Sequence, residues 1–129
     1  MPTGIDGILQ IHDIGGVSVS VLDYHKLSEG NNNADVIKSS AGQIYGIHVF
    51  NNAGYPVYIK FYDKSTAPNP SIDVVVRTVG CQAGIRVDDI IGFSLPFATG
   101  IAIAIVKGIS DTDNTAVLAN DCIMDVDYV

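Results

Sequence analysis

Residues 39–70 read SSAGQIYGIHVFNNAGYPVYIKFYDKSTAPNP, two runs of alternating apolar and polar side chains on either side of a short break. Asn51-Asn52-Ala53-Gly54 form the break, because Asn and Gly accept the positive φ that a tight turn needs. The apolar face of the two runs consists of Tyr45, Ile47, Val49, Val57, Ile59 and Phe61. The stretch therefore predicts a β-hairpin with one buried face.

The same two-residue alternation recurs along the chain and predicts further strands. They cover residues 17–21, 36–39, 43–51, 57–64, 72–77, 100–107 and 122–129. Residues 85–95 are less regular, and we expect a loop with a short strand there. Apolar residues nowhere recur at helical spacing over three turns, so no helix is expected. Short strands separated by turns predict an antiparallel β-sandwich, of the jelly-roll or immunoglobulin-like type.

The chain has 129 residues, which fits one domain with its own core. Residues 27–35 contain three consecutive Asn and no periodicity, so they predict a loop. We expect an N-terminal segment, residues 1–36, followed by a β-sandwich domain, residues 37–129. The first segment is either an arm that reaches a neighbouring subunit or the first strands of the same sandwich.

Composition excludes some classes of partner. The formal net charge is −7, from 14 acidic and 7 basic residues, which disfavours nucleic acid as a ligand. No apolar run approaches the ~20 residues of a membrane-spanning helix, and the N-terminus lacks a secretory signal pattern. Charged residues make up 16% of the chain, against about 25% in average domains. The low charge favours burial in a homo-oligomer, although a Ser/Thr/Asn-rich surface would also explain it.

No constellation of catalytic or metal-binding residues is visible. His12 and His25 lie in loop-like contexts, His48 reads as a surface or hydrogen-bonded strand residue, and their spacings match no zinc pattern. Cys81 lacks a local base that would make it a nucleophile. We expect Cys81 and Cys122 to be buried, unpaired thiols, with a disulfide between them as the alternative. The sequence thus predicts no catalytic residue, no metal, no cofactor and no enzyme activity.

Two acidic stretches contain carboxylates that are candidates for chemistry. Asp88 and Asp89 are adjacent, so their side chains point to opposite sides of an extended chain and would flank no common substrate. They are expected in a solvated turn. Residues 111–115, DTDNT, place oxygen ligands at alternate positions but lack the Gly and the closing Glu of an EF-hand. A hydrogen-bonded turn is the preferred interpretation.

Candidate interface residues come from two strands. Tyr58, Lys60 and Tyr62 share the outward face of residues 57–64, where aromatic side chains suit a subunit contact or sugar stacking. In residues 100–107 a face of Ala side chains lies opposite Ile101 and Ile103, which predicts close packing against another sheet or subunit. Tyr58, Lys60, Tyr62, Ile101 and Ile103 are the predicted contact residues.

Several local motifs resemble those of small β-rich virion structural proteins of tailed bacteriophages. The matching positions are Ser40-Ala41-Gly42, Asn51, Lys60-Phe61-Tyr62, Ala67-Pro68, Phe97, Thr99-Gly100 and Asp111-Thr112-Asp113. The resemblance covers about residues 39–129 and leaves the N-terminal third without a counterpart.

The resemblance implies a capsid decoration, or cement, protein that assembles as a homotrimer and bridges neighbouring subunits of the major capsid protein. Such a protein would be made in the host cytoplasm and reside on the capsid surface of the virion. The alternative is a head- or tail-fibre module that binds host-surface glycan through its tyrosines. A glycan hydrolase is disfavoured because no acid/base pair of carboxylates is visible.

Overall fold

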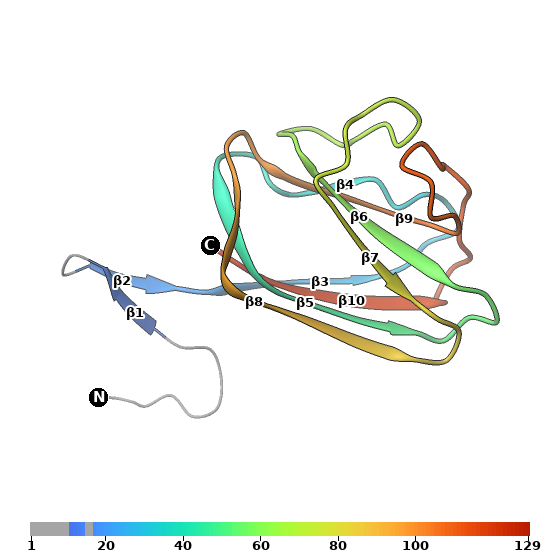
Figure 1. Cartoon of the computed structure of the whole chain (residues 1–129), viewed down its shortest axis with the longest axis horizontal. Helices are drawn as coiled ribbons and strands as arrows, with labels where there is room; N and C mark the ends of the chain where they lie inside the picture. The colour runs from blue at the N-terminus through green and yellow to red at the C-terminus, as the bar shows by residue number, and fades with distance from the viewer. Residues whose placement is uncertain (1–10, 15–16) are drawn as a thin grey trace.

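The computed structural model describes residues 11–14 and 17–129, and this part of the chain contains strands and no helix, hence none that could span a membrane (Figure 1). The strands are β1 (Ile11–Ile14), β2 (Val17–Ser20), β3 (Leu22–Leu27), β4 (Asp35–Lys38), β5 (Gly42–Asn51), β6 (Val57–Asp63), β7 (Arg77–Cys81), β8 (Arg86–Phe97), β9 (Ile101–Val106) and β10 (Cys122–Tyr128). The all-β prediction is confirmed.

Eight of these strands form two antiparallel sheets that face each other across the core (Figure 1). The first sheet has the order β3-β10-β5-β8 and the second has the order β4-β9-β6-β7. The paired strands are nested along the chain: β3 with β10, β4 with β9, β5 with β8 and β6 with β7. This winding is that of a jelly roll, so the structure decides between the two predicted sandwich types.

The predicted hairpin of residues 39–70 is wrong in its pairing, although both of its strands exist. β5 lies in the first sheet and β6 in the second, so the two strands face each other across the core instead of sharing hydrogen bonds. The connection between them has no residue with positive φ. It is organised instead by the buried side chain of Asn51, whose Nδ2 donates to the carbonyl of Tyr55 at 2.7 Å.

The core is built from the inward faces of both sheets. Its fully or nearly fully buried members are Ile44, Ile47, Val49, Val57, Ile59, Phe61, Val79, Cys81, Phe97, Ile101, Ile103, Ile105, Val117, Cys122, Met124 and Val126. In β5 the pairing register with β8 shifts between Ile44 and Gly46. This bulge breaks the alternation, so Ile44 is in the core and Tyr45, predicted to be inward, is partly exposed.

Two predictions of secondary structure are wrong: a predicted strand is mostly loop, and a predicted loop is mostly strand. The alternation at residues 72–77 predicts a strand, but β7 begins only at Arg77. Residues 85–95 are expected to be mostly loop, yet residues 86–95 belong to the long strand β8. β8 is an edge strand whose residues 91–94 have no partner in the register with β5. That bulge obscures its periodicity in the sequence.

The N-terminal part divides differently from the expected boundary at residue 36. β3 is an edge strand of the first sheet, and residue 36 falls inside β4. The sandwich therefore begins at Leu22. β1 and β2 form a separate two-stranded sheet, which extends away from the sandwich beyond the start of β3 (Figure 1). Residues 1–10 of the expected arm lie outside the described residues.

Candidate interaction surfaces

The structure places most of the predicted contact residues inside the subunit. Ile101 and Ile103 are fully buried and face the core between the sheets. Lys60 and Tyr62 lie on the outer face of β6, as the alternation predicts, but both are covered, with exposures of 0% and 1%. Only Tyr58 keeps part of its surface exposed. Four of the five side chains therefore have no surface to offer a partner.

The chain itself covers the outer face of the second sheet. The β6–β7 loop, residues 64–76, brings Val75 against Tyr62, Ala102 and Ala104. Small Ala side chains on β9 leave the space that the Tyr62 ring fills, which accounts for the Ala face seen in the sequence. The close packing predicted there is made by a loop of the same subunit.

Lys60 is held by the β9–β10 loop, residues 107–121. Its Nζ donates a hydrogen bond to the carbonyl of Ser110, and burial lowers the pKa of Lys60 although the Asp113 and Asp111 carboxylates oppose that shift. The same loop closes on itself: Asp113 Oδ1 accepts from the backbone N–H of Thr115 at 3.0 Å. The hydrogen-bonded turn expected at residues 111–115 is therefore present. The described residues contain no group of three or more His, Cys, Asp or Glu side chains that could hold a metal ion.

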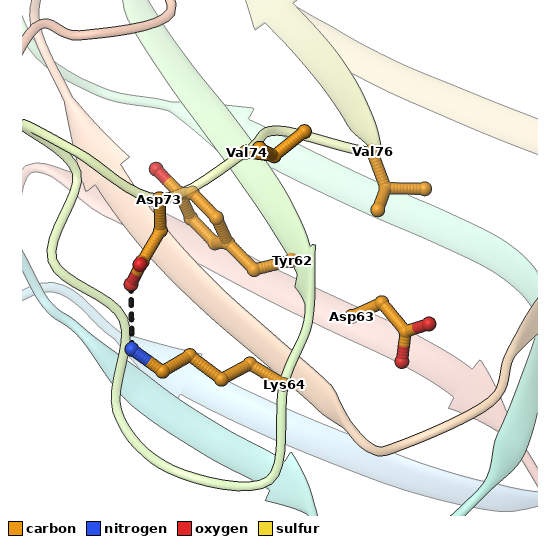
Figure 2. Close-up of a pocket in the computed structure, with 6 residues that line it drawn as sticks. All are labelled: Tyr62, Asp63, Lys64, Asp73, Val74 and Val76. Atoms are coloured by element: carbon orange, nitrogen blue, oxygen red, sulfur yellow. Dashed lines mark hydrogen bonds and ion pairs between the residues drawn. The ribbon is translucent and has the colours of Figure 1, made fainter.

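A small hollow of ≈ 190 Å³ lies beside Tyr62, between β6 and the β6–β7 loop (Figure 2). Its lining consists of Tyr62, Asp63, Lys64, Asp73, Val74 and Val76. Lys64 Nζ contacts Asp73 Oδ2 at 2.7 Å, and this hydrogen bond, with one from the Asn69 N–H, lowers the pKa of Asp73. Asp63 accepts hydrogen bonds from three backbone N–H groups of residues 98–100. Both carboxylates are thus engaged in holding loops.

One rim of this hollow belongs to a strongly exposed apolar segment, residues 72–76. Ile72, Val74 and Val76 have exposures of 74%, 83% and 43%, and Val74 and Val76 stand beside each other in Figure 2. Its apolar side chains are β-branched and alternate with Asp73 and Val75, yet residues 72–75 belong to no strand; only the Val76 N–H donates to β6, at the carbonyl of Phe61, at 2.7 Å. Exposed side chains of this kind are typical of protein contact surfaces.

The outer face of the first sheet carries a different surface, made of charged side chains. His48 on β5 contacts two carboxylates: its Nδ1 lies 2.7 Å from Asp88 Oδ1 and its Nε2 lies 3.0 Å from Asp127 Oδ2. On the neighbouring pair of strands, His25 Nδ1 lies 2.8 Å from Asp125 Oδ1. The prediction of a hydrogen-bonded strand residue is confirmed for His48.

Other expectations about the polar residues need correction. His12 lies in β1 and His25 in β3, not in loops, and Asp88 and Asp89 lie in β8, not in a turn. The two aspartates do point to opposite sides: Asp88 contacts His48 and Asp89 contacts Arg77 at 2.7 Å. The sequence signal for the His48 contacts was present but faint. Asp125 and Asp127 alternate on β10, and only the nested pairing of strands brings them beside β5.

Both cysteines are buried and unpaired, as predicted. Burial raises the pKa of Cys81 and raises that of Cys122 to about 12. Cys81 lies in β7, and its Sγ donates to the carbonyl of Ile85 at 2.9 Å. Neither thiol has the exposed, electropositive surroundings of a nucleophile.

Comparison with known proteins gives limited likeness. No family model matches the chain, and no curated protein matches it. Similar solved structures include a chain of Bacillus endospore appendages, which form a family of disulfide-linked pili, with 14% identity over 99% of this chain and 95% of that one and a TM-score of 0.43. They also include the coat protein of Tobacco streak virus, with 10% identity over 83% and 85% of the chains and a TM-score of 0.32. The fold assignment therefore rests on this chain's own strand order.

Proposed function

We propose that this chain is a bacteriophage virion structural protein, a capsid decoration protein that assembles as a homotrimer and bridges neighbouring subunits of the major capsid protein. Its role is adhesion, without catalysis. It acts on the capsid surface after synthesis in the host cytoplasm. The motif resemblance over residues 39–129 supports this proposal, and the jelly roll is compatible with it, since that fold is used in viral capsid domains among others.

The exposed segment of residues 72–76 carries the proposal. Ile72, Val74 and Val76 expose apolar surface although the chain has a complete core elsewhere. Burial of one such side chain contributes about 1.5–3 kcal/mol before the costs of association are subtracted. A structural protein needs adhesive surfaces of this kind and no active site. We therefore assign the segment to a contact with another subunit.

The N-terminal hairpin β1–β2 is a second candidate for a subunit contact. An isolated two-stranded sheet is marginally stable in water and usually needs further packing. In Figure 1 the hairpin lies beyond the end of the sandwich, so packing against another copy would supply what its own subunit does not. This corresponds to the arm that the sequence allows.

The glycan-binding alternative loses its structural basis. It requires Tyr58 and Tyr62 to form an exposed aromatic platform, and the Tyr62 ring is 1% exposed. Tyr58 alone would offer a sugar ring one partly exposed stacking surface, which is less than the platform that the glycan-binding alternative requires.

Light scattering and capsid co-sedimentation test the proposal. The full-length protein should be a trimer and should sediment with expanded capsids made from the major capsid protein of the same virus. Val74→Asp should weaken both activities, because it places a charge in the proposed contact. Ile109→Asp makes the same change at a 71%-exposed position in the β9–β10 loop and should have no effect. A wild-type monomer that ignores capsids would overturn the proposal, and equal effects of the two variants would overturn the assignment of the segment.

A further inference from the structure

His48 is contacted by a carboxylate at each ring nitrogen. The Nδ1–Asp88 distance is 2.7 Å and the Nε2–Asp127 distance is 3.0 Å. A neutral imidazole has one N–H and donates to one partner, so its other nitrogen would direct a lone pair at a carboxylate. Only the imidazolium donates to both. The geometry of the three side chains is therefore that of a protonated histidine between two aspartates.

A glycine makes room for this arrangement. A Cβ at Gly46 would lie 2.9 Å from Asp127 Oδ2 and 3.2 Å from His48 Nε2. Gly46 is opposite Asp127 in the β5–β10 pairing and two residues before His48. Any other residue at position 46 would push the Asp127 carboxylate away from the imidazole.

The groups around His48 on this face are predominantly acidic. From β10, Asp125 and Asp127 lie on its face of the sheet; from β8 come Asp88 and Arg86, whose Nε lies 3.2 Å from Asp88 Oδ2. Beyond β10, β3 supplies His25 and Asp23. Four carboxylates thus face one arginine and two histidines, and loss of the His48 proton leaves two of them, Asp88 and Asp127, without their shared cation.

We propose that protonated His48 is a pH-dependent clamp that joins β8, β5 and β10, holding the edge strand β8 at mildly acidic pH and loosening it as the proton leaves. The pairing of β8 is sensitive to the protonation of His48 because the register of β8 with β5 is interrupted at residues 91–94, directly after the part of β8 that contacts His48. The clamp concerns the subunit alone and does not depend on the function proposed above.

The direction of the pH dependence follows from the shifts. Burial lowers the pKa of His48, but hydrogen bonds to Asp127 and Asp88 outweigh burial and raise it above the ordinary value. The contribution of protonated His48 to the stability of the folded chain is then complete below about pH 6.5, the ordinary pKa of histidine. It is lost as the pH rises through the raised pKa of His48. The hydrogen bond from His48, with that from Arg86, lowers the pKa of Asp88. The Asp88 contribution is present above about pH 4 and is lost at lower pH.

NMR titration and amide hydrogen exchange of the wild-type protein provide the first test. The His48 imidazole should titrate above 6.5, and the protection factors of residues 86–90 should fall as pH rises through that value. Linkage predicts that these protection factors fall tenfold for each unit by which the pKa of His48 in the folded chain exceeds that in the unfolded chain. A His48 that titrates below 6.5 would overturn the proposal.

Three variants separate the clamp from a general effect of pH. His48→Gln should abolish the pH-dependent loss of protection in β8, and Gly46→Ala should lower the pKa of His48 by displacing Asp127. His25→Gln is the matched control, because it removes the other described imidazole of the same face; it should retain the wild-type pH dependence. If His48→Gln keeps that dependence, or His25→Gln loses it, the clamp is not at His48.

Discussion

Asn51 shows how one buried polar side chain can define a connection between two sheets. Its Nδ2 donates to the carbonyls of Tyr55 and Cys81 at 2.7 and 3.0 Å, and its Oδ1 accepts from the N–H of Ala53 at 2.9 Å. Removing this amide leaves buried backbone groups without partners, which costs about 1–3 kcal/mol for each group left unsatisfied.

We predict that Asn51→Ala lowers the free energy of unfolding by about 2–4 kcal/mol, since three backbone groups lose their partner together. Asn52→Ala, an exposed neighbour in the same turn, should change it by less than about 0.5 kcal/mol. Urea denaturation monitored by circular dichroism measures both values. Equal stabilities of the two variants would contradict the role given to Asn51.

Gly100 illustrates a second effect at the scale of a residue. A Cβ there would lie 2.6 Å from the carbonyl oxygen of Lys64 and 2.9 Å from that of Lys38. These are backbone atoms, so they cannot yield as the end of a flexible side chain would.

We predict that Gly100→Ala destabilises the protein by about 1–3 kcal/mol or more, through overpacking against the backbone. Gly92→Ala is the matched control, because no atom lies within 4 Å of a Cβ at that position and its φ is not positive. Thermal unfolding should give a lower Tm for the first variant only. A Gly100→Ala protein as stable as Gly92→Ala would contradict the predicted steric conflict.

At the scale of elements, Asp63 joins the end of β6 to the turn between β8 and β9. Its carboxylate accepts from the N–H groups of Thr99, Gly100 and Ala98 at 2.8, 3.2 and 3.1 Å, and these hydrogen bonds lower its pKa. The stabilisation is therefore present above the ordinary Asp value of about 4 and is lost as pH falls through the lowered pKa.

We predict that Asp63→Asn removes part of the stability lost on acidification, so its Tm falls less between pH 5 and pH 2 than that of the wild type. Calorimetry across this pH range measures the difference. Parallel curves for Asp63→Asn and the wild type would show that the carboxylate does not hold the turn.

The strands themselves could largely be predicted, but their pairing could not. Residues 43–51 and 57–64 alternate clearly because each strand buries one face. That pattern is identical whether the next strand along the chain lies beside it or across the core, so the hairpin interpretation of residues 39–70 failed. The strand predicted from the alternation at residues 72–77 was wrong for a related reason. Alternation shows that the side chains favour a strand, but a strand also requires a neighbouring strand to which its backbone is hydrogen-bonded.

The candidate contact residues show a similar limit at the scale of the whole molecule. Alternation assigned Lys60 and Tyr62 correctly to the outer face of β6. It carries no information about the loops of residues 64–76 and 107–121, which fold over that face and bury both side chains. The alternating Asp125 and Asp127 of β10 were a weak signal for the His48 contacts, but they did not identify His48 as the partner, since β5 and β10 are far apart in sequence and meet only in the nested winding.

The closed core also protects both thiols. Cys81 and Cys122 are almost fully buried, and burial raises the pKa of each. We predict that neither reacts with iodoacetamide in the native protein at neutral pH, and that both react once the protein is unfolded in guanidinium chloride. Intact mass spectrometry counts the modified thiols. Rapid native labelling at Cys122 would contradict the burial of β10.

The position of β10 has a consequence for how the protein is made. This strand, Cys122–Tyr128, lies between β3 and β5 in the middle of the first sheet, yet it is the last of the eight sandwich strands in chain order and leaves the ribosome after the other seven. During translation β3 therefore lacks its hydrogen-bonding partner in the sheet until β10 has been synthesised. Nascent chains that stop short of β10 should be protease-sensitive and prone to capture by chaperones, and the sandwich should close in a single late step.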